Sequence, residues 1–568
     1  MSRGVCRAAA VALTGLEGTT VMVEAAVAQQ LPGIAIIGLP DAALAEAKQR
    51  VRTAAAQAEL PLSDRFVIVN LAPASLPKQG SGFDLAIALA ALAASRHLPT
   101  TKLADTAHVG ELGLDGGLRR PVGLLSTVIA ARDLGFSRVM VPAEAGDEAR
   151  LVPDIDVIEA ASLAAAVAWH RGEPGDWTDA PRPSTVDQVT GSLGSGAGSL
   201  SESGEVSESG VVSESGAVSV AEAAVATRPG GPGESVAAGD AGAADTGSAD
   251  MSDVLGQAEA VEAMAVAAAG RHHISLIGPP GSGKTLLATR LATILPDLSP
   301  HESLVASSIA SLSGSSLRSL VTRPPFESPH HTASSAAIVG SGDSRGIRPG
   351  SISRASYGVL FMDEAPEFGR AVLDDLREPL EAGTITISRA RVHAVLPARL
   401  QLVLAANPCP CGNAGAPETA LSCTCSPNTR VRYLGRLSGP LTDRIDLRIA
   451  VRRVSSVLLG DPAVGGRVTS AELRTRVLQA RRRSQARLAG TPWNLNSEVP
   501  GEWLRSEELR LPSLATAAID RALAHGALTV RGYDRILRVA WSIADLAGVA
   551  QPGRSEVAQA LTMRGSAT

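Results

Sequence analysis

The stretch "HISLIGPPGSGKTLLATRLATIL", residues 273–295, predicts a strand, a glycine-rich loop and a helix, in that order. Its centre, "GPPGSGKT" at 278–285, matches the phosphate-binding pattern G-x-x-x-x-G-K-[ST], and the flanking strand and helix are the context that this pattern requires. The loop is predicted to surround the phosphates of a nucleotide with inward-turned backbone N–H groups and a helix N-terminus. These predicted phosphate-binding residues are Gly278, Pro279, Pro280, Gly281, Ser282 and Gly283. The fold around this stretch is therefore predicted to be α/β.

The loop ends in two side chains that complete a nucleotide site. Lys284 is one of only four lysines in the chain, against 48 arginines, and none follows it. An ammonium is a compact point charge that a planar guanidinium does not imitate, which explains one retained lysine in an arginine-biased sequence. We expect Lys284 to bind the β- and γ-phosphates and the Thr285 hydroxyl to bind Mg²⁺.

A second motif, "VLFMDEA" at 359–365, predicts a buried strand that ends in two adjacent carboxylates. We expect Asp363 to hold the Mg²⁺ shell and Glu364 to orient the attacking water. The predicted cofactors are ATP and Mg²⁺, and the predicted reaction is hydrolysis.

The chain of 568 residues is long enough for three or four domains. Strand and helix patterns alternate before residue 171, and helical periodicity dominates after about residue 467. Between them, a Gly/Ser/Ala-rich acidic tract repeats "SESGEV", "SESGVV" and "SESGAV", and such a tract is predicted to be a disordered tether. We predict an N-terminal domain at 1–171, a linker at 172–250, an ATPase core at 251–455 and a helical lid at 456–568.

Charge is unevenly distributed along the chain. The overall net charge is −5, but residues 172–250 carry −11 and residues 427–568 carry +10. A basic C-terminal third suits a polyanionic partner such as nucleic acid, while a solvated arginine-rich surface is an equally simple explanation. The longest uncharged apolar run, 85–95, is too short to span a membrane, and no signal peptide is predicted. We expect a cytoplasmic protein without membrane contact.

Several longer strings carry a resemblance to a known family: "FESPHHTAS" (326–334), "RPGSISRASYGVLFMDEAPEF" (348–368), "LREPLEAGTITISRA" (376–390), "AANPCPCG" (405–412) and "LSGPLTDRIDL" (437–447). With the two nucleotide motifs, the sequence resembles AAA+ ATPases of the magnesium-chelatase/MCM-like clade, and more narrowly the YifB/ComM family, which is named for a competence-associated DNA helicase. The resemblance covers essentially all of the chain except the linker.

The resemblance implies roles for three further residues. Asn407 would be the polar sensor beside the γ-phosphate, Arg444 the arginine finger that reaches a neighbouring subunit's ATP, and Arg531 the second sensor, in the lid. An ion pair of Arg444 with Asp443 or Asp446 is the alternative without the family context. A finger acting in trans implies a ring, expected to be a hexamer, acting on single-stranded or branched DNA.

Alternation on both sides of "RARVH" predicts a hairpin ahead of the "LQLVLAANP" strand. In this clade such hairpins project into the central pore, so Arg389 and Arg391 are candidate phosphate contacts. His330 and His331 could face DNA or a neighbouring subunit, although a His-His pair is more often structural.

Four cysteines, Cys409, Cys411, Cys423 and Cys425, follow a C-x-C-x₁₁-C-x-C spacing. Four thiolates around one ion would make a closed structural zinc site in a Gly/Pro-rich insert that has no core of its own. Reduced thiols and a redox pair are the alternatives.

The N-terminal part, through "LPKQGSGFDLAIALAAL" and "VGELGLDGGLRRPVGLLSTVIAAR", resembles the Lon-protease proteolytic domain, which has a ribosomal-S5-domain-2-like α+β fold. At the family's nucleophile position this chain has Gly82, with Ser81 one residue away, and at the general-base position it has Leu125. A serine without a base is a weak nucleophile, so we predict a domain without peptidase activity. Lys78 acting with Ser81 is the minor alternative.

Three functions remain open. The first, which the family resemblance implies and which the hairpin arginines and the basic C-terminal third favour, is an ATP-driven motor on DNA that promotes branch migration in recombination or natural transformation. The second is the motor subunit of a magnesium-chelatase-type enzyme. The third is an ATP-dependent protease, which Gly82 and Leu125 disfavour.

Overall fold

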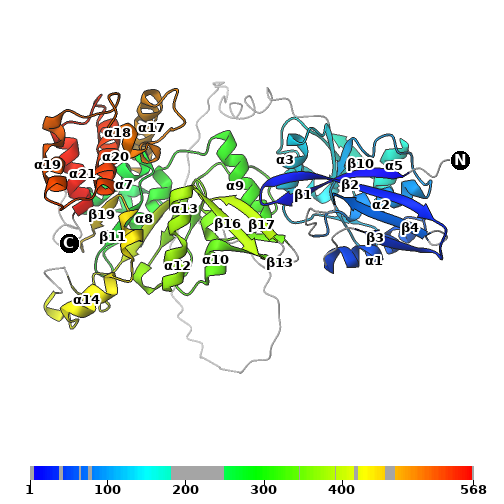
Figure 1. Ribbon diagram of the computed structural model, residues 1–568, viewed down its shortest axis with the longest axis horizontal. Coiled ribbons are helices and arrows are strands. Elements are labelled where there is room, and N and C mark those ends of the chain that lie inside the picture. Colours follow the sequence, from blue (N-terminus) through cyan, green and yellow to red (C-terminus); the bar gives the residue numbers. More distant parts are fainter. Residues whose placement is uncertain are drawn as a thin grey trace, which may run out of the picture. The chain divides into compact units, whose positions relative to one another are not determined.

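A computed structural model of the chain describes residues 5–37, 42–62, 66–73, 80–180, 249–343, 346–389, 392–414, 420–453 and 467–565 (Figure 1). The predicted linker lies almost entirely outside these residues, as do Lys78 and Arg391. No helix within the described ranges combines the length and the apolarity that crossing a bilayer requires.

The N-terminal part is built on a mixed sheet of eight strands in the order β10-β9-β8-β5-β1-β2-β4-β3. Its strands are β1 (Cys6–Thr14), β2 (Glu17–Ala28), β3 (Gly33–Ile37), β4 (Phe66–Ala72), β5 (Thr106–His108), β8 (Arg138–Pro142), β9 (Asp156–Ala160) and β10 (Trp177–Ala180). β1 and β2 form an antiparallel hairpin that turns at Gly15, whose φ of +72° favours glycine. A separate ribbon pairs β6 (Glu111–Leu112) with β7 (Leu118–Arg119).

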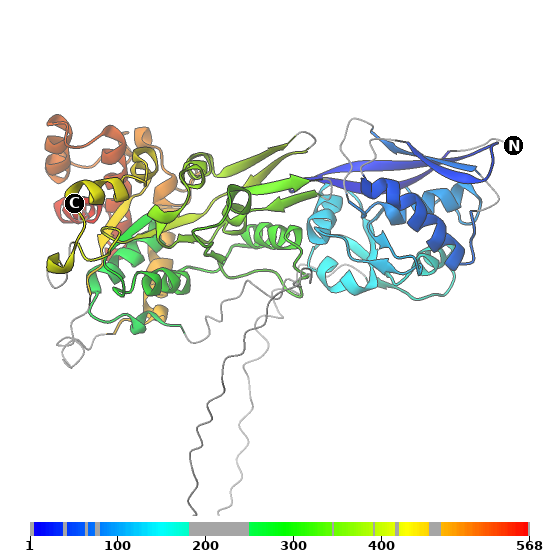
Figure 2. The same ribbon diagram turned by 90° about the horizontal axis from the view of Figure 1, so that it is seen from below.

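Helices cover both faces of this sheet, because alternate strand residues belong to two separate cores. α1 (Ala42–Gln57), α2 (Asp84–Ala94) and α5 (Leu163–Arg171) pack on one face, where Figure 2 shows the blue helices against the blue strands. α3 (Leu124–Asp133) and α4 (Gly146–Ala149) pack on the other face. α2 is buried from Asp84 to Ala93, because alternating leucine, isoleucine and alanine side chains let it approach β1 and β2 closely.

The central part contains a five-stranded, all-parallel sheet in the order β12-β15-β18-β11-β19. Its strands are β11 (Ile274–Ile277), β12 (Phe326–Glu327), β15 (Val359–Met362), β18 (Gln401–Ala406) and β19 (Leu447–Ala450). β15 and β18 are buried along their whole length, as their continuous apolar runs predict for strands covered on both faces.

Two hairpins and a set of helices complete the central part. The hairpins pair β13 (Gly340–Asp343) with β14 (Gly346–Pro349) and β16 (Thr384–Arg389) with β17 (Val392–Pro397). The helices are α7 (Ala258–Gly270), α8 (Lys284–Ile294), α9 (Pro300–Leu312), α10 (Ser335–Val339), α11 (Ser351–Arg354), α12 (Arg370–Asp375), α13 (Arg377–Ala382), α14 (Pro427–Leu434) and α15 (Gly439–Asp443).

The C-terminal part is helical among the described residues and comprises α17 (Ser470–Arg487), α18 (Gly501–Leu504), α19 (Ser513–Ala524), α20 (Val530–Ala547) and α21 (Arg554–Gly565). α20 packs against α17, α21 and α7, and its buried residues share one core with the central sheet (Figure 1, orange and red). Asp446, just before β19, fastens this packing: it accepts a hydrogen bond from Arg535 of α20 at 2.5 Å and one from the backbone N–H of His273. The predicted α/β class, followed by a helical end, is confirmed.

Candidate functional site

The candidate nucleotide site lies where three parallel strands end at one edge of the central sheet. The last residue of β11, Ile277, pairs with the last residue of β18, Ala406, and β15 runs beside β18 in the same direction. Gly278, Asp363 and Asn407 directly follow these three strands. In open parallel sheets the carboxyl ends of the strands are where ligands bind, so the two motifs and the predicted sensor converge where a nucleotide would be expected.

The backbone of the phosphate loop depends on its glycines. Gly281 and Gly283 have φ values of +73° and +89°, which L side chains rarely adopt. A Cβ on Gly278 would lie 2.2 Å from the backbone oxygen of Val451. Gly283 is the N-cap of α8 and offers no side-chain cap, so the first N–H groups of this helix are left for an anion.

Lys284 is buried in this loop. Its Nζ donates hydrogen bonds to the carbonyl oxygens of Gly278 (2.7 Å) and Pro279 (3.0 Å) and to Oδ1 of Asn407 (3.1 Å). Burial lowers the pKa of Lys284, while nearby carboxylates oppose that shift. Because all three hydrogen-bond partners are neutral oxygens, the positive charge remains available to a phosphate.

A hydroxyl and a carboxylate that could hold Mg²⁺ lie beside the lysine. The Thr285 hydroxyl donates to Oδ2 of Asp363 at 2.8 Å, so the two oxygen atoms already lie side by side. Such oxygen ligands suit Mg²⁺, which is usually held by one or two protein groups together with phosphates and water.

Glu364 follows with a left-handed backbone, at φ +50°. Its backbone N–H donates to Oδ1 of Asp363 at 2.9 Å, which holds the Asp363 carboxylate against the Glu364 backbone. Left-handed backbone at a residue other than glycine is costly and is typical of positions where orientation matters. Its side chain is half exposed.

His331 is a neighbour of Glu364 that the sequence analysis did not anticipate. Its Nδ1 lies 3.5 Å from Oε2 of Glu364, and its ring stacks on that of His330 with centroids 4.1 Å apart. β12 pairs in parallel with β15, so the segment after β12 reaches the same sheet edge as the segment after β15. The expected DNA-facing or subunit-facing role of the two histidines stays a prediction, whereas the contact with Glu364 is observed.

Arg444 and Arg531 line one cleft of about 710 Å³, to which Arg271, Arg399, Arg535 and Arg538 also contribute. Its lining residues, all within the described part of the chain, include neither the phosphate loop nor Asp363, Glu364 or Asn407. The two arginines therefore share a cleft that residues of this chain's own nucleotide site do not line.

Arg444 pairs with Glu381 rather than with the two aspartates that flank it in the sequence. Its Nη2 lies 2.5 Å from Oε1 of Glu381, and its Nη1 donates to the carbonyl of Pro440 at 2.7 Å. Asp446 forms an ion pair with Arg535, and a carboxylate oxygen of Asp443 lies 3.9 Å from the guanidinium of Arg531. The expected alternative, a local ion pair with Asp443 or Asp446, is not formed; the partner comes from α13.

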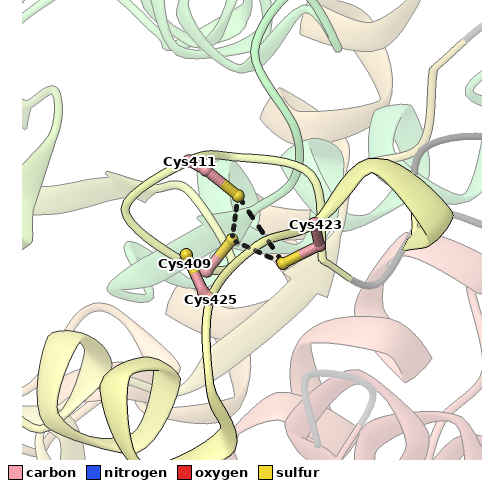
Figure 3. Close-up of side chains that lie close together, drawn as sticks. All are labelled: Cys409, Cys411, Cys423 and Cys425. Carbon is pink, nitrogen blue, oxygen red and sulfur yellow. Dashed lines mark hydrogen bonds between the residues drawn. The ribbon is translucent and has the colours of Figure 1, made fainter.

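The four cysteines converge, as Figure 3 shows. Their sulfurs all lie within 4.8 Å of one another, with Cys409 3.4 Å from Cys411 and 3.8 Å from Cys423. A disulfide would need about 2 Å, so the four are free thiols. Two N–H groups point at the cluster, from Ala414 to Cys409 and from Arg430 to Cys423. This arrangement could hold one metal ion.

The predicted hairpin is present as β16 and β17, paired from Thr384 with Pro397 to Arg389 with Val392. Arg391, between the strands, lies outside the described residues, and the side chain of Arg389 is likewise not described. Their predicted phosphate contacts remain predictions.

Many arginines of the C-terminal part are engaged inside the molecule. Arg481 donates to the carbonyl of Ala268, and Arg487 pairs with Asp545 at 2.6 Å. Burial lowers the pKa of Arg481 to about 10. A large share of the positive charge counted in the sequence thus stabilises helix packing and is not free to meet a polyanion.

The N-terminal part does not assemble a serine–lysine pair among the described residues. Ser81 donates a short hydrogen bond to the carboxylate of Glu111. Leu125 is fully buried in α3 with Leu124 and Val128, away from any proton transfer. A carboxylate could take a proton from Ser81, but no lysine lies at the position that the Lon-type pattern requires.

Three family models match the chain in series. They describe subunit ChlI of Mg-chelatase (residues 23–145), magnesium chelatase subunit ChlI (250–458) and the C-terminal part of that subunit (467–564). Among curated relatives, the competence protein ComM of Haemophilus influenzae is 35% identical over 97% of this chain and 95% of its own length. YifB of Escherichia coli is 36% identical over 94% and 92%.

The chain belongs to the YifB/ComM family. A protein of Mycobacterium tuberculosis is 41% identical over 98% of both chains, so the likeness extends through the N-terminal part as well. The resemblance seen in the sequence is confirmed. This YifB/ComM chain is an ATPase of the magnesium-chelatase-like AAA+ class, and its central sheet is the AAA+-like core.

Proposed function

We propose that this YifB/ComM chain is an ATP-driven ring motor that acts on DNA, as a branch-migration helicase in recombination or natural transformation. The observation that carries the proposal is the separation of Arg444 and Arg531 from this chain's own phosphate loop. We infer that these two arginines act on ATP bound by a neighbouring copy. Such a contact is head-to-tail, and head-to-tail contacts form a ring when the rotation between copies closes. The competence name of a relative supports DNA as the substrate.

Within each site, the contacts support the following proposed roles. Lys284 is proposed to bind the β- and γ-phosphates through an ammonium that three neutral oxygens hold in place. Thr285 and Asp363 are proposed to hold Mg²⁺, which when bound neutralises phosphate charge. Glu364 is proposed to orient the attacking water, and Asn407 to sense the γ-phosphate.

Arg444 is proposed to complete the site of the next subunit. To do so it exchanges the carboxylate of Glu381 for the transferred phosphoryl group, where an arginine finger is worth about 10³–10⁵ in rate. Arg531, largely exposed on the same cleft, is proposed as the second sensor. A hexamer is the ring size that we propose.

We also propose Zn²⁺ as the ion of the four-cysteine cluster. With a Zn–S distance of about 2.3 Å, the edge of a tetrahedral ZnS₄ unit is about 3.8 Å. The sulfurs of Cys409, Cys411 and Cys423 already lie 3.4–3.8 Å apart. Four protein ligands leave no open position, so the role proposed is structural.

We propose the domain division 1–171, 172–250, 251–455 and 456–568, with the first domain serving assembly or partner binding rather than peptide cleavage. Ser81 with Glu111, and the buried Leu125, support the absence of peptidase activity. A casein digest with a Ser81→Ala control tests this, and serine-dependent cleavage would contradict it.

The test of the motor uses two inactive variants. Glu364→Gln lacks the water-orienting group, and Arg444→Ala lacks the finger, so each alone should hydrolyse almost no ATP. Mixed in equal amounts, they should regain about a quarter of wild-type turnover, because in a ring that share of sites pairs an intact Glu364 with a neighbour's intact Arg444. A mixture as inactive as its components would overturn action in trans. Stimulation by single-stranded, forked and junction DNA then tests the substrate.

The second candidate is a magnesium-chelatase-type motor subunit, favoured by the three matches to subunit ChlI models. It predicts turnover that responds to a porphyrin and a partner subunit rather than to DNA. Measuring ATP hydrolysis with each additive separates the two.

A further inference from the structure

The loop that carries the four cysteines is connected to the nucleotide site in two ways, by the continuous backbone and by non-covalent contacts. It begins directly after β18, with Asn407 only two residues before Cys409. The Oδ1 atom of Asn407 accepts a hydrogen bond from Lys284 at 3.1 Å. Any change in the path of the chain at Cys409 therefore acts on the residue that contacts the phosphate-binding lysine.

A second contact joins the same loop to the phosphate loop. Gly412, with φ +77°, lies so close to Pro280 that a Cβ added to Gly412 would be 2.4 Å from the Pro280 Cδ atom. The carbonyl of Pro280 is held by Nη2 of Arg453 at 2.9 Å. The phosphate loop is thus confined between the cysteine loop and the segment after β19.

The cysteine loop has few other means of keeping its shape. Among its described residues, Cys409, Gly412 and Ala414 are buried, and the rest are partly or fully exposed. The arm with Cys423 and Cys425 runs to α14, whose N-cap is Ser426. Without an ion, the contacts between the four sulfurs, which all lie within 4.8 Å of one another, would be weak S–H contacts, and the sulfurs would repel one another once ionised.

The donors around the sulfurs suit a charged metal–thiolate centre. The guanidinium of Arg430 donates to the Cys423 sulfur at 3.3 Å, and the N–H of Ala414 donates to the Cys409 sulfur at 3.4 Å. A ZnS₄ unit carries two negative charges, and groups that donate to the ligand sulfurs orient and stabilise it.

We propose that the metal-loaded four-cysteine cluster clamps the loop after β18 onto the phosphate loop, so that loss of the metal weakens ATP binding. This inference rests on the proposed nucleotide site but not on the proposed DNA substrate. The clamp acts through two contacts, Asn407 on Lys284 and Gly412 on Pro280. The cluster is then a metal-dependent control on the ATPase.

The first experiment asks whether the metal is there and whether ATP binding needs it. Purified full-length protein should contain one zinc per chain by elemental analysis. The Cys423→Ser/Cys425→Ser variant removes two ligands from the arm that does not contact the phosphate loop. It should lose the metal and bind a fluorescent ATP analogue at least about tenfold more weakly, while Cys6→Ala, the cysteine outside the cluster, should keep both properties. Less than a tenth of an equivalent of zinc in the wild type, or iron in its place, would overturn the metal assignment.

The second experiment tests the clamp without removing a ligand. Gly412→Ala should retain one zinc but raise the dissociation constant for the ATP analogue about tenfold, because its Cβ would displace Pro280. Gly526→Ala is the matched control: its φ is +69°, and nothing lies within 4 Å of the added carbon. Wild-type ATP affinity in the zinc-loaded Gly412→Ala protein would overturn the coupling.

A reversible treatment guards against misfolded variants. A mercurial reagent that ejects zinc should lower ATP binding, and thiol with added zinc should restore it, with the circular dichroism unchanged throughout. ATP binding that persists after complete zinc release would contradict the clamp. All of these measurements are made without DNA, so a failure of the DNA-motor proposal leaves them unaffected.

Discussion

Lys284 shares its ammonium among two carbonyls of its own loop and the amide of Asn407. Removing one of these acceptors separates the two proposed roles of Asn407. In Asn407→Ala, we expect kcat for ATP to fall about a hundredfold, the loss typical of one preorganised polar group in a reaction site. The loop carbonyls still hold the lysine, so we expect the ATP dissociation constant to change by less than about tenfold.

The matched variant is Asn407→Asp, which sets a carboxylate against the ammonium. It should weaken ATP binding more than Asn407→Ala does, because the lysine charge is then neutralised before phosphate arrives. Titration with a fluorescent nucleotide and steady-state turnover measure both. Equal loss of binding in the two variants would contradict the proposed contact.

The His331 imidazole contacts the carboxylate proposed to orient water, so its loss should be felt in the chemical step. We expect His331→Ala to lower kcat about tenfold with little change in KM, since no phosphate contact is removed. His331→Asn, which can still donate to Glu364, should recover part of the loss. His301→Ala, on the exposed side of α9, is the control. A KM effect without a kcat effect would rule out a positioning role.

Between elements, the packing of β5 on α5 places two imidazoles in contact in the N-terminal part. Nδ1 of His108 donates to the carbonyl of Ala9 at 3.0 Å, so its Nε2 is left to accept from Nε2 of His170 at 3.1 Å. Burial lowers the pKa of both, that of His108 to about 4 from an ordinary 6.5. Both rings are therefore neutral in the folded domain.

This pair gives a pH dependence of stability with a defined sign. Below pH 6.5 the two histidines bind protons in the unfolded chain but stay neutral in the folded domain. The free energy of unfolding therefore falls as the pH falls. For His108 alone the loss reaches about 2 kcal/mol by pH 5. Thermal unfolding followed by the fluorescence of Trp169, which packs edge-on against His170, should show it. The His108→Leu/His170→Leu variant should flatten this slope between pH 7 and pH 5, and His525→Gln should leave it unchanged.

Most elements of the central part could be predicted from sequence, because short uninterrupted apolar runs such as those of β15 and β18 are typical of buried parallel strands. The first strand, β1, is not predicted from sequence. Its residues are considered there only as a possible signal peptide, which is not predicted either. Its alanine-rich run has little strand propensity of its own, and it forms a strand because it pairs with β2 on one side and β5 on the other.

Of the site, the parts predicted from sequence are those that lie in contiguous motifs, from Gly278 to Thr285 and at Asp363 and Glu364. Their roles, like those of Asn407 and Arg531, stay predictions. The contacts of His331 with Glu364 and of Arg444 with Glu381 join residues far apart in the chain. Such pairs depend on strand order and helix placement, which no local pattern contains.

For the whole molecule, the engaged C-terminal arginines move the expected DNA contacts toward the hairpin of β16 and β17. In the Arg389→Ala/Arg391→Ala variant, the ratio of DNA-stimulated to basal ATP turnover should fall toward one. In a plot of the logarithm of the DNA-binding constant against the logarithm of the salt concentration, the magnitude of the slope should fall by about 2. Each substitution removes one arginine that would neutralise a phosphate. Arg370→Ala, on an exposed arginine of α12, is the control. An unchanged salt slope would remove the hairpin from the DNA path.

The connection between that hairpin and the central sheet has a mechanical consequence. β17 ends at Pro397 and β18 starts at Gln401, and the N–H of Ala398 is fastened to the carbonyl of Gly383 at the hairpin's base. An extended strand transmits a pull along its axis with little stretch. If the hairpin contacts DNA as proposed, a load on β17 would reach Asn407, at the end of β18, through this short segment. The proposed motor would then couple tension in the nucleic acid to the residue that contacts Lys284.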